Sequence, residues 1–193
     1  NEQAEILYLS RCPDVINAQE GFFDVESVWP KLEQALRQAI SNLVSMRETE
    51  GSNIYGDFIK RADLIAEKLA VIEERSPQVV EEYQIRLSDR INELLAKHNQ
   101  VIEPERLLQE VAIFADRTSI TEEIVRLKSH IKQFKLIIDA DQPVGRKLDF
   151  LIQEFNREAN TIASKANDYT LAQVVVEIKA EIEKIREQIQ NIE

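Results

Sequence analysis

The sequence predicts an all-α protein with five or six helices, in which a long helical hairpin is followed by a smaller helical bundle. The 193 residues include four Gly and five Pro, whereas all-β proteins need a turn about every 8–12 residues and are usually richer in both. Apolar residues also recur at steps of three or four along most of the chain, which is the period of a helix with one buried face. We expect residues 1–103 to form the hairpin region and residues 104–193 a carboxy-terminal helical domain.

The hairpin region begins with an apolar opening that ends near Cys12–Pro13, and a loop is expected at Gly21. Ser76–Pro77 predicts a break and a restart between two long helices, because Ser caps helix starts and Pro is tolerated in a first turn. The second helix should end near His98–Asn99 and run antiparallel to the first. The first helix carries a long apolar stripe from about Asp24 onward: Val28, Leu32, Leu36, Ile40, Leu43, Val44, Ile65, Leu69 and Ile72.

The carboxy-terminal domain begins with a helix that Pro104 opens. Ser119 and Glu122 have the spacing of a capping box, and so do Thr170 and Gln173, so each pair predicts a helix start. The last helix has a nearly heptad apolar line, which a partner helix from this chain or another subunit must cover. We expect this line to mediate self-association: Leu171, Val174, Ile178, Ile182, Ile185, Ile189 and Ile192.

The charge distribution bounds the possible partners. The net charge of −11 argues against a passive electrostatic binder of nucleic acid, because such proteins are usually basic. From Arg117 to Lys165, however, nine Lys or Arg residues face seven Asp or Glu residues, a net charge of +2. This central stretch is therefore the part that could tolerate a polyanion.

The remaining composition points to the cytoplasm. Cys12 is the one cysteine, which excludes a disulfide framework and a Cys-rich metal site and fits a reducing compartment. No stretch approaches the ~20 apolar residues of a membrane helix, and no signal peptide is visible near Asn1. The chain lacks an initiator Met and begins within a pattern, so we expect a fragment whose natural amino-terminal portion is missing.

An unusual polar stripe marks the helix expected from about Arg146 to Lys165. Asp149, Gln153, Asn156 and Asn160 are spaced by four, three and four residues, so they share one side of that helix. Asn and Asp are poor helix formers, and a merely solvated face would use Glu, Lys and Gln. The stripe therefore predicts either a ligand or catalytic surface or, alternatively, a polar seam between helices or subunits.

The preceding helix carries the second group of candidates: Glu122, Glu123, Arg126 and His130. The acids and Arg126 have the spacing of ordinary surface ion pairs, and a lone helical His is more often structural than catalytic. Carboxylates, a guanidinium and an imidazole within two turns are nevertheless what phosphodiester cleavage uses, for proton transfer or for holding a metal. His98 has less polar company and is interpreted as structural. No phosphate loop, zinc spacing or nucleophile elbow is present.

Several segments together resemble the YicC family of bacterial endoribonucleases. They are LDFLIQEFNREANTIASKA within 148–166, the ending VVEIKAEIEKIREQIQNIE, the early LSRCPDVI, and the spacing of Arg117, Glu122, Glu123, Arg126 and His130. The resemblance implies a cytoplasmic endoribonuclease that acts on RNA, forms a ring-like homo-oligomer (a hexamer in the full-length protein) and depends on a divalent cation, Mg or Mn. It also implies an additional amino-terminal domain, absent here, which could contribute to RNA binding, assembly or the active site.

The resemblance suggests roles for matching residues. The expected catalytic residues are Glu122, Glu123, His130, Asp149, Glu154 and Glu158. The expected RNA-binding residues are Arg126, Arg146, Asn156, Arg157, Asn160 and Lys165. Glu123, Asp149 and Glu154 are the candidate metal ligands. The predicted function is metal-assisted cleavage of single-stranded or structured RNA, and the alternatives are a non-catalytic RNA-binding adaptor and an oligomerisation scaffold.

Overall fold

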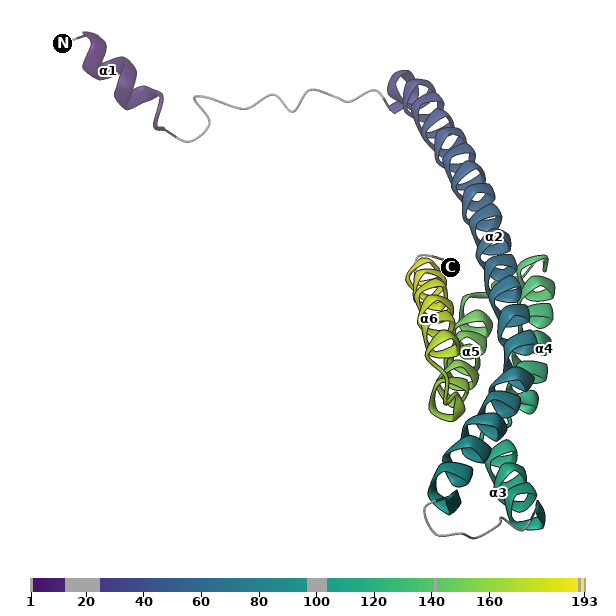
Figure 1. The fold of residues 1–193 in the computed structure, drawn as a ribbon. Coiled ribbons are helices and arrows are strands. Elements are labelled where there is room, and N and C mark those ends of the chain that lie inside the picture. The colour runs from purple at the N-terminus through teal and green to yellow at the C-terminus, as the bar shows by residue number, and fades with distance from the viewer. Residues whose placement is uncertain (1, 13–24, 97–103, 141, 191, 193) are drawn as a thin grey trace. The chain divides into compact units, whose positions relative to one another are not determined.

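The computed structural model describes residues 2–12, 25–96, 104–140, 142–190 and 192, and all regular structure in these ranges is helical (Figure 1). The helices are α1 (Glu2–Leu9), α2 (Val25–Ala96), α3 (Pro104–Arg117), α4 (Thr121–Ile138), α5 (Gly145–Lys165) and α6 (Tyr169–Ile189). The all-α prediction is confirmed. The chain divides into two compact units, Asn1–Thr49 and Glu50–Glu193.

The first unit contains α1 and the beginning of α2. Its part of α2 repeats apolar residues at helical spacing, as the sequence predicts, but within the described residues these side chains are exposed rather than packed. Trp29, for example, is 55% exposed. The exposed stripe comprises Val28, Leu32, Leu36, Ile40, Leu43 and Val44.

The second unit contains a four-helix bundle, made by the later part of α2 with α4, α5 and α6, and also α3. The part of α2 after Glu50 contacts α4, where the rings of Phe58 and Phe134 lie 5.5 Å apart, and contacts α6, where Arg61 donates to Glu181 at 2.8 Å. Helix α5 packs against both α4 and α6. In Figure 1, α4, α5 and α6 accordingly lie side by side along this part of α2. The bundle encloses one core that all four helices supply.

Helix α2 passes through Ser76–Pro77 without a break, so the predicted hairpin turn at that point is wrong. A proline inside a helix costs about 3 kcal/mol or more, and here packing on both sides opposes that cost. Ile72 and Val79 are both buried in the core, and Arg75 donates to Asp168 of the α6 start at 2.9 Å. The expected loop at Gly21, the helix end at His98–Asn99 and the domain boundary after residue 103 lie outside the described residues.

The chain turns back only at α3, beyond the end of α2. The rings of Tyr83 in α2 and Phe114 in α3 stack with centroids 3.6 Å apart and planes 8° from parallel. The stacked pair holds α3 against the last turns of α2, so the helical hairpin exists at a later position than predicted.

Neither predicted capping box forms. Helix α4 begins after Ile120, which makes no side-chain cap and is 1% exposed, so burial rather than capping positions this start. Helix α6 begins after Asp168, whose carboxylate accepts from the Leu171 amide at 2.9 Å. Asp168 can cap the helix and pair with Arg75 at the same time. Thr170 offers no such second partner, and the earlier residue therefore becomes the cap.

The apolar line of α6 packs inside the bundle. Five residues of the predicted line are each at most 5% exposed, namely Leu171, Ile178, Ile182, Ile185 and Ile189. The other two, Val174 and Ile192, are partly buried against the same core. The chain itself supplies the covering helices, so the expectation that this line mediates self-association is wrong. Among the described residues, none of the helices combines the length and the apolar character needed to cross a membrane.

Candidate functional site

A ladder of charged groups runs along the contact between α4 and α5, and we name it the α4–α5 seam. At one end, Lys165 Nζ lies 2.8 Å from Glu123 Oε1. One turn along α4, Arg126 Nη1 lies 3.8 Å from Glu158 Oε1. A further turn brings His130 to the same carboxylate. The contacts follow this order because α4 and α5 are antiparallel, so later residues of α4 lie opposite earlier residues of α5.

The end of this seam is an acid–imidazole cluster of His130, Glu154 and Glu158. One ligand atom from each residue lies within 4.8 Å of the other two, and in the described part of the chain this is the single such group of His, Cys, Asp or Glu. Glu158 is 3% exposed, whereas His130 and Glu154 are half-buried. The cluster is therefore open to solvent on one side and closed by the bundle on the other. The ring of Phe155 lies 6.4 Å from the His130 ring beneath it.

The donor set of the cluster fits a divalent cation. Two carboxylate oxygens and one imidazole nitrogen are suitable ligands for Mn²⁺, and carboxylates alone suit Mg²⁺. Among the described residues the Glu158 carboxylate receives no hydrogen bond, and the cation that pairs with it is Arg126, at 3.8 Å. A buried carboxylate without a donor is costly, and a bound cation would compensate that cost.

Glu123 belongs to the seam but is held differently. It is 6% exposed, its Oε1 accepts from Lys165, and its buried Oε2 has no partner in the described structure. Burial by itself would raise the pKa of Glu123, but the Lys165 hydrogen bond, the residue's own backbone N–H, and the charges of Lys165 and Arg126 together lower it. Glu123 is therefore ionised in the folded protein, and its charge is already committed to Lys165.

The remaining charged candidates near the seam are exposed. Glu122 pairs with Arg126 across one turn of α4, and Arg157 Nη1 lies 3.5 Å from Glu154 Oε2. Arg157 has a side chain that is 68% exposed, so its guanidinium can reach a ligand in front of the cluster. Arg146 is exposed at the start of α5, beside a separate hollow that Ile189 of α6 also lines.

The predicted polar stripe opens onto a groove between α5 and α6, which we name the amide groove. It has a volume of about 620 Å³ and is lined by Asp149, Ile152, Gln153, Asn156, Arg157, Asn160, Thr161 and Arg186. Gln153 donates to Asp149 at 3.2 Å. In contrast, the amides of Asn156 and Asn160 make no hydrogen bond with any described residue, so they are not part of a seam within this chain. Arg157 is shared, since it lines the groove and also pairs with Glu154 of the cluster.

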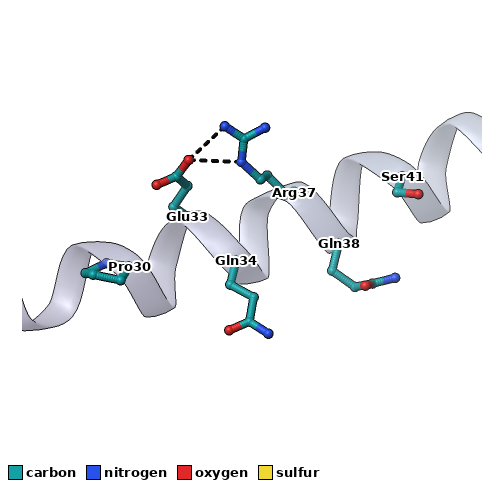
Figure 2. Close-up of a pocket in the computed structure, with 6 residues that line it drawn as sticks. All are labelled: Pro30, Glu33, Gln34, Arg37, Gln38 and Ser41. Atoms are coloured by element: carbon teal, nitrogen blue, oxygen red, sulfur yellow. Dashed lines mark hydrogen bonds and ion pairs between the residues drawn. The ribbon is translucent and has the colours of Figure 1, made fainter.

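A further hollow lies on the first part of α2, and Figure 2 shows the side chains that line it. All of them project from one helical segment, and Glu33 and Arg37 are joined there as an ion pair with a 2.7 Å contact. The lining has an acid but no imidazole or second carboxylate beside it. We therefore do not regard this hollow as a candidate catalytic site.

The structure brings together part of the predicted site. His130, Glu154 and Glu158 converge with Arg126, and of the three candidate metal ligands only Glu154 lies in this cluster. Glu123 is further along the seam, and Asp149 faces the amide groove. Arg186 of α6 lines the same groove and was not predicted. It belongs to an ordinary charged helical face in the sequence, so no local pattern distinguishes it.

Comparison with known proteins shows which family the chain resembles. Residues 72–193 match the family model described as "Endoribonuclease YicC-like, C-terminal", and residues 1–56 match "Endoribonuclease YicC-like, N-terminal region". We expected the amino-terminal domain to be absent, but residues 1–56 do match a model of that region.

Two curated relatives are similar along nearly the whole chain. A protein of Clostridioides difficile (strain 630) named "Probable endoribonuclease YicC" is 47% identical over 192 residues, which is 100% of this chain and 65% of the relative. A protein of Haemophilus influenzae with the same name is 36% identical over 183 residues, 95% of this chain and 62% of the relative. The chain thus spans a little less than two thirds of the length of these relatives. It belongs to the YicC-like endoribonuclease family.

Proposed function

We propose that the protein is an endoribonuclease that cleaves RNA phosphodiester bonds at the acid–imidazole cluster with the help of a divalent cation. The observation that carries this proposal is the cluster itself: an imidazole and two carboxylates with ligand atoms within 4.8 Å, one carboxylate being almost wholly buried. The names of the two relatives support the reaction class.

Each group of the cluster has a chemical use in this proposal. Glu158, Glu154 and His130 would hold the cation, which when bound stabilises negative charge on a phosphate. Glu154 and His130 both reach solvent, so whichever of them does not bind the cation could exchange a proton with an attacking oxygen. The exposed guanidinium of Arg157 is placed to donate a charge-assisted hydrogen bond to a phosphate oxygen. Glu123 and Lys165 are assigned to positioning, because their charges already neutralise one another.

Cleavage of single-stranded and structured RNA by the full-length natural protein tests the proposal. The His130→Ala and Glu158→Gln variants should lose about 10²–10⁴-fold in kcat/KM, and chelation with EDTA should abolish cutting by the unmodified protein. Glu67→Gln, which changes an exposed acid on the bundle portion of α2, serves as the matched control and should cut normally. Unchanged cutting by both cluster variants would remove the cluster from the mechanism.

A second readout separates metal binding from activity. Mn²⁺ at 100 times its Kd should raise the free energy of unfolding by about 2.7 kcal/mol, and Glu158→Gln should abolish this gain while Glu67→Gln keeps it. An equal gain in both variants would place the cation elsewhere.

A non-catalytic RNA-binding adaptor is the second candidate function. The unpaired amides of the amide groove favour it, because they can bind RNA without any reaction. Salt-dependent RNA binding by a preparation that shows no cleavage at any metal concentration would support the adaptor over the nuclease.

We also propose that the protein forms a homo-oligomer, the ring-like assembly that the family resemblance implies. The exposed apolar stripe on the first part of α2, which includes Leu36 and Ile40, supports a partner surface there. Sedimentation of the full-length protein would measure the subunit number, and a monomer at micromolar concentration would contradict the proposal.

A further inference from the structure

The amide groove lies directly beside the acid–imidazole cluster but is chemically unlike it. Its lining is rich in uncharged amides, with Arg157 and Arg186 at its margins and one acid, Asp149. A site built only to hold phosphate would concentrate cationic groups and backbone amides. A site for a nucleobase needs neutral donors and acceptors, because base edges are neutral and carry both.

The two asparagines have the properties of base-reading side chains. Asn156 is half-buried and Asn160 is exposed, and neither amide is engaged by another described residue. Each carboxamide offers a donor and an acceptor side by side, which is the arrangement that pairs bidentately with a base edge. The hydroxyl of Thr161 donates to the Arg157 carbonyl at 3.0 Å, so it contributes an oxygen acceptor rather than a competing donor.

The dimensions and margins of the groove also suit a nucleotide. Its volume of about 620 Å³ lies within the range of about 300–1,000 Å³ typical of small-ligand sites. Ile152, which is fully buried, lies beneath the groove and closes its floor. The planar guanidiniums of Arg157 and Arg186 can stack on a base or meet a phosphate.

Arg157 fixes the position of this groove relative to the cluster. Its Nη1 lies 3.5 Å from Glu154 Oε2, and the same residue lines the groove. A nucleotide whose base occupied the groove would therefore have its phosphate near Arg157, at the edge of the cluster. The two sites are adjacent enough to engage neighbouring parts of one RNA strand.

We propose, resting on the nuclease function above, that the amide groove binds an unpaired nucleobase next to the scissile phosphate, with Asn156 and Asn160 reading its edge. Bases in an A-form duplex present their Watson–Crick edges to one another, and sequence-specific RNA recognition mostly targets unpaired bases. The substrate class is therefore single-stranded RNA or a loop, and the groove gives cleavage a preference for one base at one flanking position.

The first arm of the test measures base preference. The full-length protein and its Asn156→Ala/Asn160→Ala variant would cut a single-stranded RNA pool randomised in sequence, and sequencing of the ends gives the preference at each flanking position. The variant should lose about tenfold or more of the cutting at the favoured base. The control Gln109→Ala/Gln173→Ala removes two exposed amides elsewhere on α3 and α6 and should keep the original preference. The proposal would be overturned if the asparagine variant and the glutamine control had the same base preference, or if the unmodified protein had no base preference.

The second arm does not depend on cleavage. In EDTA, fluorescence anisotropy with a labelled single strand and with the matching duplex should show that Asn156→Ala/Asn160→Ala weakens single-strand binding about tenfold and leaves duplex binding unchanged. If the asparagine variant loses single-strand binding but the unmodified protein cleaves no RNA, the nuclease function is wrong and the base-binding groove is supported. If the asparagine variant cuts RNA normally, with unchanged single-strand binding and base preference, the base-binding groove is wrong and the nuclease function is supported. A change in sedimentation of the asparagine variant would identify the amides as a subunit contact and overturn the proposal.

Discussion

The two polar sides of α5 differ in how far their groups are already committed. Toward α4, the side chains are charged, partly or wholly buried, and paired: Glu123 with Lys165 and Glu158 with Arg126. Toward α6, they are mostly neutral amides, and those of Asn156 and Asn160 have no partner among the described residues. One helix thus carries a surface that the fold needs and a surface that the fold leaves available. Breaking the ion pairs on the first side should lower stability, whereas replacing the two asparagines on the second side should change ligand binding alone.

The largest expected effect on stability is that of Lys165→Ala. This change leaves the buried charge of Glu123 without its partner, and breaking a buried pair costs about 3–5 kcal/mol. Because the Lys165 side chain is 36% exposed, water can partly replace it and we expect a loss nearer about 2–3 kcal/mol. Urea unfolding at pH 7 measures it. Lys147→Ala, which alters an exposed lysine of the same helix, is the control and should stay within about 0.5 kcal/mol. Equal losses of stability in Lys165→Ala and Lys147→Ala would show that the α4–α5 seam does not stabilise the fold.

A smaller effect on stability is expected when low pH protonates Glu123 and so breaks its ion pair with Lys165. Since the pKa of Glu123 is lower in the folded than in the unfolded chain, its contribution is present above the unfolded pKa and is lost as the pH falls through the folded pKa. The free energy of unfolding should therefore decline below about pH 4.5. It should decline less steeply in Glu123→Gln. The hydrogen bond from Arg75 likewise lowers the pKa of Asp168, so the variant keeps part of the slope. Identical slopes in both proteins between pH 5 and pH 3 would contradict the assignment.

The smallest effect on stability is expected in the amide groove. Asn156→Ala and Asn160→Ala remove no hydrogen bond within the described chain and replace a poor helix former by the best one. Each should leave the free energy of unfolding unchanged or raise it by about 0.5 kcal/mol. Thermal or urea unfolding of the single variants would measure this. A loss above about 1 kcal/mol in either would mean that these amides stabilise the fold, and the contrast between the two sides of α5 would disappear.

Much of the site could be predicted because helical periodicity sorts residues by face. The spacing of Asp149, Gln153, Asn156 and Asn160 predicted one shared side, and the structure places all four on the amide groove. The convergence of His130 with Glu154 and Glu158 could not be derived from spacing, because it depends on how α4 and α5 are aligned along their length. Arg186 was missed for the same reason, since its relation to α5 exists only after α6 has packed.

Two errors show where local rules yield to packing. Pro77 is a strong local signal for a helix start, yet the buried residues Ile72 and Val79 on either side keep α2 continuous. Ser119 has the right spacing for a cap, but the buried side chain of Ile120 occupies that position instead. In both cases the burial of apolar side chains outweighs the local preference of a single residue for a helix start.

By itself, the sequence determined the all-α class, the apolar face of each bundle helix and the polar composition of α5. These properties follow from the helical repeat and from the low Gly and Pro content. Tertiary structure alone decided which apolar helix face packs against which other helix. Leu36 and Leu69 belong to the same kind of stripe on the same helix, yet Leu36 is 54% exposed and Leu69 is fully buried. A periodic pattern states that a surface is apolar, whereas its partner depends on contacts between residues far apart in the chain.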